Sequence, residues 1–460
     1  MERVKMAVEH KETGSRAKAL TWLAIGILAS TALILVLVAF GNQPGLAPWL
    51  TPLLAAAGIV FRLKAATREF AFTAWVLAFV AWAMVWPAAF SRWMGYDLRL
   101  LIVPLVQVIM FGMGTKLSGQ DFVRVLLMPK PVLIGVCLHF GVMPVAGYAI
   151  ARVFGFPPEI AAGVVLVGSV SSGVASNVIV YLAGGNVALA VTITACSTLV
   201  SPIMTPFLMK TLAARMVPID FFAMMMEMLS MVIAPVVAGL VAHKVLYSQG
   251  PRWRRVGPLL ILAAGSFALA TAIHLAPARY AGAFSALTRG LVMALCLVGL
   301  VAVLKLVVIN WLAGPADWMD RALPFISMAG ICVIIGIITA RSRDRLLTVG
   351  LSIIVAAMLH NGLGYLLGYW LARALRLNET TCRTISVEVG MQNGGMATGL
   401  AMSVLQSADA ALAPAIFGTW MNISGSVLAS WWRRRPVPQE PTALGSSPIR
   451  ELRPEQKATR

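Results

Sequence analysis

The stretch EVGMQNGGMATG, from Glu388 to Gly399, places one carboxylate, two side-chain amides and four glycines inside a long apolar region. A charge in an apolar medium is costly unless a partner neutralises it, so an acid within a membrane-spanning segment is a candidate functional residue. One carboxylate together with neutral hydroxyl, amide and carbonyl oxygens is the ligand chemistry expected for a hard cation such as Na⁺. Glu388, Gln392 and Asn393 are therefore the first candidates for an ion site.

A related segment lies 221 residues earlier in the chain. Residues 139–152, HFGVMPVAGYAIAR, match residues 360–373, HNGLGYLLGYWLAR, at six of fourteen positions. The same offset aligns GSVSSGVASN (168–177) with VGMQNGGMAT (389–398), so each copy of the repeat leads into a helix interrupted by Gly, Ser and Asn. Paired interruptions of this kind are typical of the binding site of a secondary transporter, and an odd number of spans between the copies predicts an inverted repeat.

Interrupted helices supply two kinds of binding group. Unwound backbone within a membrane must line a cavity or lie inside protein, because lipid cannot satisfy its polar groups. The half-helix after each break presents free N–H groups that attract an anion, and the released carbonyl oxygens suit a cation. Ser176 and Asn177 lie at the first break, and Thr194 lies on the next span, which is unusually rich in Ser and Thr.

The composition indicates what holds these breaks in place. Of 460 residues, 59% are hydrophobic and only 12% are charged, with a mean hydropathy of +0.84. Many apolar runs reach the roughly 18–20 residues that span a bilayer, which predicts an all-helical, multi-pass membrane protein. The five cysteines form no CxxC pair, and no nucleophile–base–metal set or nucleotide motif is visible. We therefore expect no enzyme activity and no cofactor other than a coupling ion.

About fourteen spans can be placed. They lie near 19–41, 46–62, 70–90, 98–115, 130–154, 158–182, 186–209, 218–242, 256–276, 284–312, 321–340, 346–372, 379–405 and 411–432. The net charge of +19 falls mostly in short loops and both tails, with Arg373, Arg376 and Arg383 as one loop cluster. This pattern sets topology rather than indicating nucleic acid, and it predicts a cell (plasma or inner) membrane protein with both termini cytoplasmic.

Two basic segments need separate mention. The loop RSRDR at 341–345 falls on the predicted outer side and dissents from the charge rule. The run RRRP at 433–436 is explained by topology, although it could also touch anionic lipid. The polar segment 436–460 that follows is predicted to be a disordered cytoplasmic tail. We expect a monomer.

Three segments in order resemble the bile acid:sodium symporter family: FGMGTKL (111–117), GGNVALAVTITACSTLVSPIMTP (184–206) and EVGMQNGGMATGLA (388–401). The resemblance covers about 70–246 and 319–434. It implies a ten-helix core of two inverted five-helix repeats, in which a panel domain packs against a core domain with two broken, crossing helices. The expected parts are a two-span extension (1–69), the first repeat (70–246), an inserted pair of spans (247–318), and the rest of the second repeat (319–435), broken at 388–397.

The resemblance also implies two sodium sites. The positions that match the first are Ser176, Asn177, Thr194 and Glu388, whereas Ala190 lacks a hydroxyl that the family often has. The positions that match the second are Glu388, Val389, Met391 and Gln392, the middle two through backbone carbonyls.

A glutamine that the family adds to the second site corresponds here to His139. A neutral imidazole is a poor Na⁺ ligand, and histidine titrates near neutral pH. Three readings stay open: one Na⁺ with a relaxed second site, partial replacement of Na⁺ coupling by H⁺, or a structural histidine in the core.

The function that the resemblance implies is sodium-coupled symport of an organic anion by alternating access. The anion would bind near Asn393 and Gly394, with Val174 where some bacterial members have threonine. The alternatives are a proton-coupled or mixed-coupling transporter that uses His139 and, more remotely, a membrane-embedded enzyme or sensor. Bile acids, 2-keto acids, pantoate-like acids and sulfonated anions all remain possible substrates.

Overall fold

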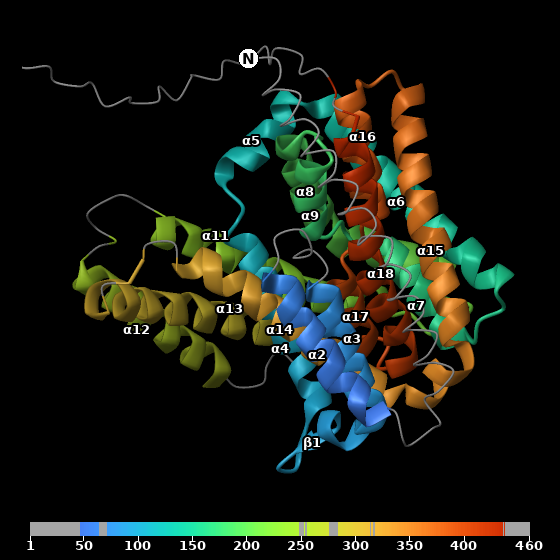
Figure 1. Ribbon diagram of the computed structural model, residues 1–460. Helices are drawn as coiled ribbons and strands as arrows, with labels where there is room; N and C mark the ends of the chain where they lie inside the picture. Colours follow the sequence, from blue (N-terminus) through green and yellow to red (C-terminus); the bar gives the residue numbers. More distant parts are fainter. Residues whose placement is uncertain are drawn as a thin grey trace, which may run out of the picture.

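A computed structural model describes residues 47–63, 71–247, 253, 255–275, 284–312, 314–315, 318–435 and 437 of the 460-residue chain. The expected first span at 19–41 lies outside the described residues, as does the expected tail apart from residue 437. Within the described part, nearly all regular structure is helical, and the remainder is one two-stranded hairpin (Figure 1). The predicted all-helical fold is confirmed.

Each predicted span from 46–62 onward contains a helix or a bent pair of helices. The longer helices are α2 (Ala47–Leu63), α3 (Ala71–Val85), α4 (Ile102–Gly114), α6 (Pro129–Val153), α9 (Val187–Leu212), α11 (Ala234–Tyr247), α12 (Val256–Leu275), α13 (Phe284–Lys305), α14 (Trp318–Arg341), α15 (Arg343–Ala374) and α18 (Ala408–Arg433). Among the described residues, eight helical segments are long and apolar enough to cross a membrane. A bent pair of shorter helices, Leu98–Gly114 and Gly119–Leu127, makes a ninth if the pair is counted as one span.

Two spans are broken at the places that the repeat predicts. The first consists of α7 (Pro158–Ser169) and α8 (Ala175–Leu182), and the second consists of α16 (Glu379–Gly390) and α17 (Gly394–Ser403). Adding 221 to the bounds of α7 and of α9 gives the bounds of α16 and of α18. The two halves therefore share one plan of elements, down to the residues at which these helices begin and end.

The two breaks satisfy each other's backbone groups. The Gly173 N–H donates to the Met391 carbonyl at 3.2 Å, and the Asn393 N–H donates to the Ser171 carbonyl at 2.9 Å. These bonds form a single antiparallel bridge between Ser172 and Gln392. The two unwound segments thus lie side by side and run in opposite directions inside the protein, where lipid does not meet their polar backbone.

Two groups of helices surround the breaks. α6 and α15 pack beside them, and α9 and α18 complete this group, which stands upright in Figure 1. In the other group, α3 packs on α14, and α4 packs closely on α11. A Cβ at Gly114 would come within 2.2 Å of the Val236 carbonyl oxygen, and one at Gly239 would come within 2.2 Å of the Phe111 carbonyl oxygen. Glycine at both positions permits this backbone approach.

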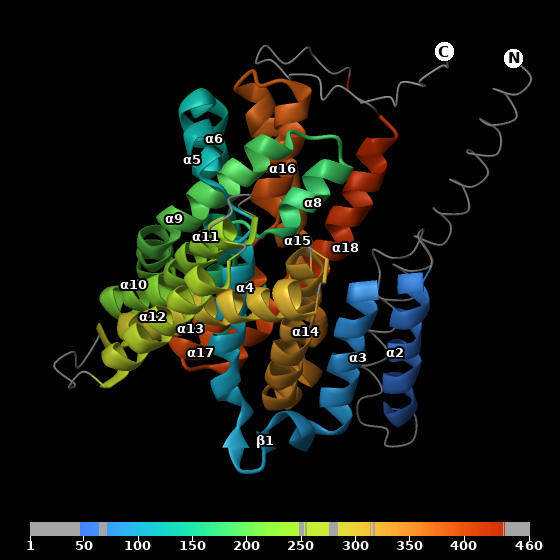
Figure 2. The same ribbon diagram turned by 90° about the vertical axis from the view of Figure 1, so that its left-hand side faces the viewer.

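Additional helices lie outside these two groups. α12 and α13 pack on each other, α13 also packs on α11, and α2 lies beside α3 at the edge of the molecule (Figure 2). The buried Lys305 of α13 donates its Nζ protons to the carbonyls of Val245 and Leu246 at the end of α11. Cations favour the C-terminal end of a helix, so this bond ties the α12–α13 pair to its neighbour.

Short elements complete the fold. They are η2 (Pro87–Phe90), β1 (Arg92–Trp93), β2 (Tyr96–Asp97), η3 (Leu98–Leu101), α5 (Gly119–Leu127), α10 (Phe221–Met228) and the π-helical turns η4 (Leu229–Ile233) and η6 (Leu306–Trp311). The sequence analysis missed α5 because it is short and amphipathic. Ser118 and Asp121 begin it with a capping box, the reciprocal bonds that stabilise a helix start.

The basic loop at 341–345, which does not follow the positive-inside rule, has acidic partners. Arg341 forms an ion pair with Asp97 of the β1–β2 hairpin, and Arg345 pairs with Asp409 at 3.0 Å. The backbone N–H of Arg99 donates to Asp97 and, with Arg341, holds the pKa of that carboxyl below its ordinary value of 3.8. Two of the loop's arginines are thus neutralised locally, which reduces their weight as topology signals.

Candidate functional site

Glu388 lies fully buried in the last turn of α16, where three elements converge on its carboxylate. Ser176 of α8 donates to Oε1 at 2.5 Å, and Thr194 of α9 donates to Oε2 at 2.8 Å. Among the described residues, no Lys or Arg forms an ion pair with it. Two hydroxyls orient the carboxylate, but they leave its charge without a counter-charge, and a bound cation would supply one.

Two side-chain oxygens at the breaks are buried and have no donor. In the part of the chain that the structure describes, Asn177 Oδ1 and Gln392 Oε1 accept no hydrogen bond. The amide of Gln392 is fixed by its other end, because Nε2 donates to the Val389 carbonyl at 2.7 Å. A buried acceptor without a donor is rare in folded proteins, and neutral amide oxygens on the two broken spans are ligands of the kind that a hard cation prefers.

Helix α9, which carries Thr194, has several further buried hydroxyls. Thr198 donates to the Thr194 carbonyl at 2.7 Å, and Thr205 donates to the Ser169 carbonyl at the end of α7, also at 2.7 Å. Thr192 donates to the Ala188 carbonyl within its own helix. Ala190 is buried on the same helix and offers no oxygen ligand from its side chain. Thr194 is therefore the hydroxyl of α9 that contacts Glu388, and the others hold backbone carbonyls.

The backbone carbonyls expected at the second sodium site already accept internal hydrogen bonds. The Met391 carbonyl accepts from the Gly173 N–H and from Ser172 Oγ, each at 3.2 Å. The Val389 carbonyl accepts from Gln392, as above. The Gly390 carbonyl between them accepts from Asn361 Nδ2 at 2.7 Å. At this second site the oxygen without a donor is therefore the Gln392 side-chain amide and not one of these carbonyls.

His139 is buried in α6 and touches both breaks. Its Nδ1 lies 3.0 Å from the Glu388 carbonyl oxygen, and its Nε2 lies 2.8 Å from the Val170 carbonyl oxygen. Val170 is the C-cap of α7, and the N–H that would normally bond the Glu388 carbonyl belongs to Gln392 and points at Met421 Sδ instead. His139 therefore contacts two carbonyls that lack their usual helical hydrogen bonds because of the breaks. Both of its ring nitrogens face these carbonyls, so neither directs a lone pair at an ion.

The residues expected near the anion lie at the starts of the two half-helices. Asn393 caps α17 by accepting from the Met396 N–H at 3.0 Å, and its Nδ2 lies 3.9 Å from Met110 Sδ of α4. Gly394 follows it, so close to α18 that a Cβ there would lie 3.0 Å from the Gly418 Cα. Val174 is half-buried at the start of α8 and makes no side-chain cap. The start of α17 thus lies against α4, between the two helix groups.

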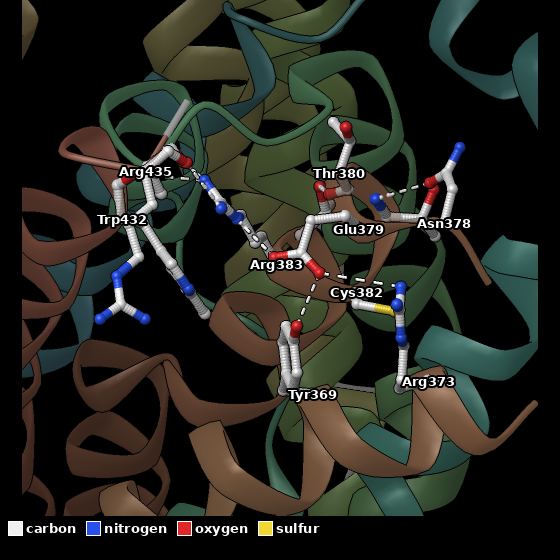
Figure 3. Close-up of polar contacts among 12 residues, drawn as sticks. Tyr369, Arg373, Asn378, Glu379, Thr380, Cys382, Arg383, Trp432 and Arg435 are labelled. Carbon is white, nitrogen blue, oxygen red and sulfur yellow. Dashed lines mark hydrogen bonds and ion pairs between the residues drawn. The ribbon is translucent and has the colours of Figure 1, made fainter. Parts of the chain in front are cut away.

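Arg383 holds the far ends of these helices together. It is 5% exposed, and its guanidinium donates to the carbonyls of Ala183 at the end of α8 and of Trp432 and Arg435 at the end of α18 (Figure 3). Its Nε donates to Glu379 of its own helix at 2.9 Å. The sequence analysis placed this arginine among loop charges, which is wrong: a guanidinium can lie within α16 because helix-end carbonyls and a carboxylate accept its protons.

Two further contributors were not singled out from the sequence. Ser172 bonds across to the second break, and Asn361 supports the Gly390 carbonyl. A signal existed for each, because Ser172 lies in the quoted GSVSSGVASN segment and Asn361 directly follows the repeated His360. Single Ser and Asn residues in apolar helices are common, however, so their positions had to be seen.

Comparison with known proteins identifies a transporter family and related chains. Residues 103–309 match the profile described as the Sodium Bile acid symporter family. The chain is 31% identical over 364 residues to the "Uncharacterized sodium-dependent transporter YocS" of Bacillus subtilis (strain 168), across 79% of this chain and 91% of that protein. It is 29% identical over 370 residues to the "Probable sodium/metabolite cotransporter BASS1, chloroplastic" of Oryza sativa subsp. japonica, across 79% of this chain and 73% of that protein.

A solved structure, that of the sodium proton antiporter MjNhaP1 from Methanocaldococcus jannaschii, aligns at 12% identity with a TM-score of 0.43. The alignment covers 90% of this chain and 97% of that one. The family and the relatives are named as transporters rather than as enzymes. Since the Bacillus subtilis relative is matched over nearly its whole length, this multi-pass membrane protein belongs to the sodium bile acid symporter family.

Proposed function

We propose that this protein is a sodium-coupled symporter that carries an organic anion across the cell membrane by alternating access. The observation that carries the proposal is the buried Glu388 carboxylate, which two hydroxyls orient and no cationic side chain neutralises within the described residues. The printed names of the relatives, a sodium-dependent transporter and a sodium/metabolite cotransporter, support the same coupling ion.

In this proposal Na⁺ is a transported substrate that joins three elements. Glu388 would supply the charge from α16, Ser176 and Asn177 would supply oxygens from α8, and Thr194 would supply one from α9. The buried and donor-free Asn177 Oδ1 supports this set. A cation here would offset the cost of the buried carboxylate and would hold the two broken spans together.

A second sodium would use Val389, Met391, Gln392 and Glu388. Gln392 Oε1 supports this site because it is buried without a donor. The internal bonds of the Val389 and Met391 carbonyls make the site weaker than the first, because a second ion would have to share or displace these donors. The number of Na⁺ ions carried per cycle therefore depends on this second site: it is one if only the first site binds and two if both bind.

The organic anion would bind at the starts of α8 and α17. The positive end of a helix dipole attracts a carboxylate or sulfonate. Asn393 would orient the anion, and Gly394 would lie beside it at the start of α17, where the missing Cβ lets this helix pack closely on α18. Val174 would contribute an apolar contact in place of a hydroxyl, which favours a substrate with an apolar portion at that point.

Transport would follow from movement of one helix group against the other. Residues 70–246 and 319–435 would form the two inverted repeats, with α12 and α13 inserted between them, and the shared element bounds and the antiparallel bridge support this division. The core would comprise α6–α9 and α15–α18, and the panel would comprise α3, α4, α10–α11 and α14. A Cβ at Gly399 of α17 would come within 2.7 Å of Met231 Sδ, so the two groups meet closely there. We propose cytoplasmic termini and a monomeric carrier.

Reconstitution tests this function directly. Purified protein in proteoliposomes would be screened with bile acids, 2-keto acids, pantoate-like acids and sulfonated anions, under an inward Na⁺ gradient and with choline in place of Na⁺ at fixed pH. Uptake of at least one anion should depend on Na⁺. Uptake that is the same in choline would contradict sodium coupling.

A proton-coupled or mixed mechanism is the second candidate, and the contacts of His139 favour it. A neutral imidazole has one N–H, so it can donate to only one of the two carbonyls, whereas a protonated ring donates to both. A pH gradient should then drive uptake without Na⁺, and His139→Gln should abolish that component. Uptake indifferent to the pH gradient in both proteins would leave His139 a structural residue.

A further inference from the structure

A groove of about 470 Å³ lies between α15 and α18, which pack on each other. Its walls are apolar and aromatic, and they include Met358, Trp420 and Trp431. Trp431 is 48% exposed and Met358 is 39% exposed, so the groove opens outward rather than into the protein. In a membrane-spanning protein an outward-facing apolar groove meets acyl chains.

The groove continues into a pair of arginines. Its α18 residues follow helical spacing, from Trp420 through Ser424 and Val427 to Trp431, and Arg434 and Arg435 follow directly after the end of this helix. The Arg435 guanidinium lies 4.4 Å above the centre of the Trp431 ring. Figure 3 shows Arg435 beside Trp432, at the end of α18. Both arginines are exposed, and among the described residues neither pairs with a carboxylate.

The part of this stripe between Ser424 and the arginines spans about one leaflet. Ser424 and Arg434 are ten residues apart, which corresponds to roughly 15 Å along a helix. The hydrocarbon core of a bilayer is about 30 Å thick, so half of it is about 15 Å. If the breaks lie near the midplane, as broken transporter helices do, the arginines lie at headgroup depth in the leaflet at the C-terminal end of α18.

The floor of the groove is polar and reaches the second break. Ser424 donates to Asn361 Oδ1, and Asn361 Nδ2 donates to the Gly390 carbonyl at 2.7 Å. Tyr365 lies 3.4 Å from Ser424 through its hydroxyl. A molecule in the groove would therefore cover the bridge that holds Gly390, next to the carbonyls of the second break.

We propose that an anionic phospholipid binds in this groove, with one acyl chain along the stripe from Trp431 to Trp420 and its phosphate at Arg434 and Arg435. Charge complementarity selects the anionic headgroup, and the apolar walls select a lipid over a soluble phosphate. The site does not rest on the proposed transport function, because lipid binding can be measured without substrate or Na⁺.

Native mass spectrometry of the full chain in neutral detergent tests the site. Equal amounts of phosphatidylglycerol and phosphatidylcholine with identical chains are offered to the wild type and to variants. The wild type should retain phosphatidylglycerol in several-fold preference. Arg434→Gln combined with Arg435→Gln should remove the preference, and Val427→Trp, which fills the groove, should reduce retention of both lipids.

Matched controls separate this site from general attraction. Arg433→Gln removes an exposed charge from a different face of α18 and should leave the preference unchanged. Val355→Trp adds the same bulk at a residue that is 38% exposed on α15 and does not line the groove, and it should leave retention unchanged. Soluble glycerol phosphate should not raise the thermal midpoint, whereas phosphatidylglycerol should.

Three results would overturn the proposal. They are equal retention of the two lipids by the wild type, an Arg433→Gln effect as large as that of the Arg434 and Arg435 pair, and protection by glycerol phosphate equal to that by lipid. Equal retention would also follow if the segment 19–41 or a second copy of the chain covered the groove. If Val427→Trp failed to fold, the arginine variants would still decide the outcome.

Discussion

The two broken spans share one plan but carry different chemistry. The first break, from Val170 to Val174, offers neutral groups only, and the helix after it begins without a side-chain cap. The second break, from Met391 to Asn393, follows the carboxylate of Glu388 and begins its next helix with an asparagine cap. The charge of the site therefore comes from one repeat, and most of its hydroxyls come from the other.

Because of this difference, neither break alone could supply both the charge and the oriented oxygens that the proposed cation site needs. The first lacks a counter-charge, and the second lacks hydroxyl donors to orient its carboxylate. The contacts between Ser176 and Glu388 join them, as do the backbone bonds between the unwound segments. A cation could bind at this junction only while the two broken spans are together. Its binding would therefore depend on how the helix groups are arranged, as coupling of an ion to domain movement requires.

Removing the charge should have the largest effect. Glu388→Gln keeps the shape of the side chain but leaves no anionic ligand, and removing one partner of a buried charge pair costs about 3–5 kcal/mol. We expect the half-saturating Na⁺ concentration for uptake to rise at least about 100-fold.

Glu227→Gln is the matched control for that change. Glu227 is also a largely buried membrane acid, but Arg289 lies 3.7 Å from it. Its replacement should leave Na⁺ dependence near that of the wild type. Wild-type Na⁺ dependence in Glu388→Gln proteoliposomes would contradict the assignment of the charge to the second break.

Removing a hydroxyl from the other repeat should have a smaller effect. Ser176→Ala deletes a hydrogen bond to a charged group, worth about 1.5–3 kcal/mol, so Na⁺ affinity should fall roughly 10- to 100-fold. Thr194→Val should act similarly and keep the side-chain shape. Titration of uptake against Na⁺ measures both. If either variant matched the wild type, its hydroxyl would not belong to the ion site.

Crowding the junction should weaken it without touching a ligand. A Cβ at Gly173 would lie 2.9 Å from the Gln392 carbonyl oxygen, so Gly173→Ala must push the breaks apart, and overpacking of this kind costs about 1–3 kcal/mol. We expect a lower thermal midpoint and weaker Na⁺ binding. Gly141→Ala is the control, because a Cβ there meets nothing within 4 Å. Equal effects of the two substitutions would show that the breaks need not be in contact.

The smallest effect is expected far from both breaks. Asp97→Asn removes the partner of Arg341, and exposed pairs contribute about 0–1 kcal/mol. Because the folded pKa of Asp97 is lowered, its contribution is present at neutral pH and is lost as the pH falls through that value. The thermal midpoints of wild type and variant should differ slightly at neutral pH and converge as the pH falls below the ordinary carboxyl value of 3.8. Na⁺ dependence should be unchanged, and a change in it would link this hairpin to the ion site.

The repeat explains how much the sequence could predict. The offset of 221 placed both breaks, because glycines and small polar residues interrupt apolar helices in the same register. Glu388 stood out because a carboxylate in such a region has few structural uses. The helix ranges followed from long apolar runs, which are the most reliable signal in a membrane protein.

Other features depended on tertiary contacts that no local pattern encodes. The hydrogen bonds of Asn361 and Ser172 join residues far apart in the chain. Arg383 resembled a loop charge because its acceptors are the ends of two distant helices. His139 could be identified as a departure from the family, but its two carbonyl partners became visible only when the breaks were placed side by side.

The most direct measurement is the thermal midpoint of the purified protein as Na⁺ replaces K⁺ at constant ionic strength. A cation that binds only the folded junction stabilises it by mass action, so the wild-type midpoint should rise with Na⁺ and then level off according to its affinity. Glu388→Gln should show no Na⁺-dependent rise, and Glu227→Gln should rise like the wild type. A wild-type midpoint that is the same in Na⁺ and K⁺, or an equal rise in Glu388→Gln, would contradict a sodium site at the junction of the two breaks.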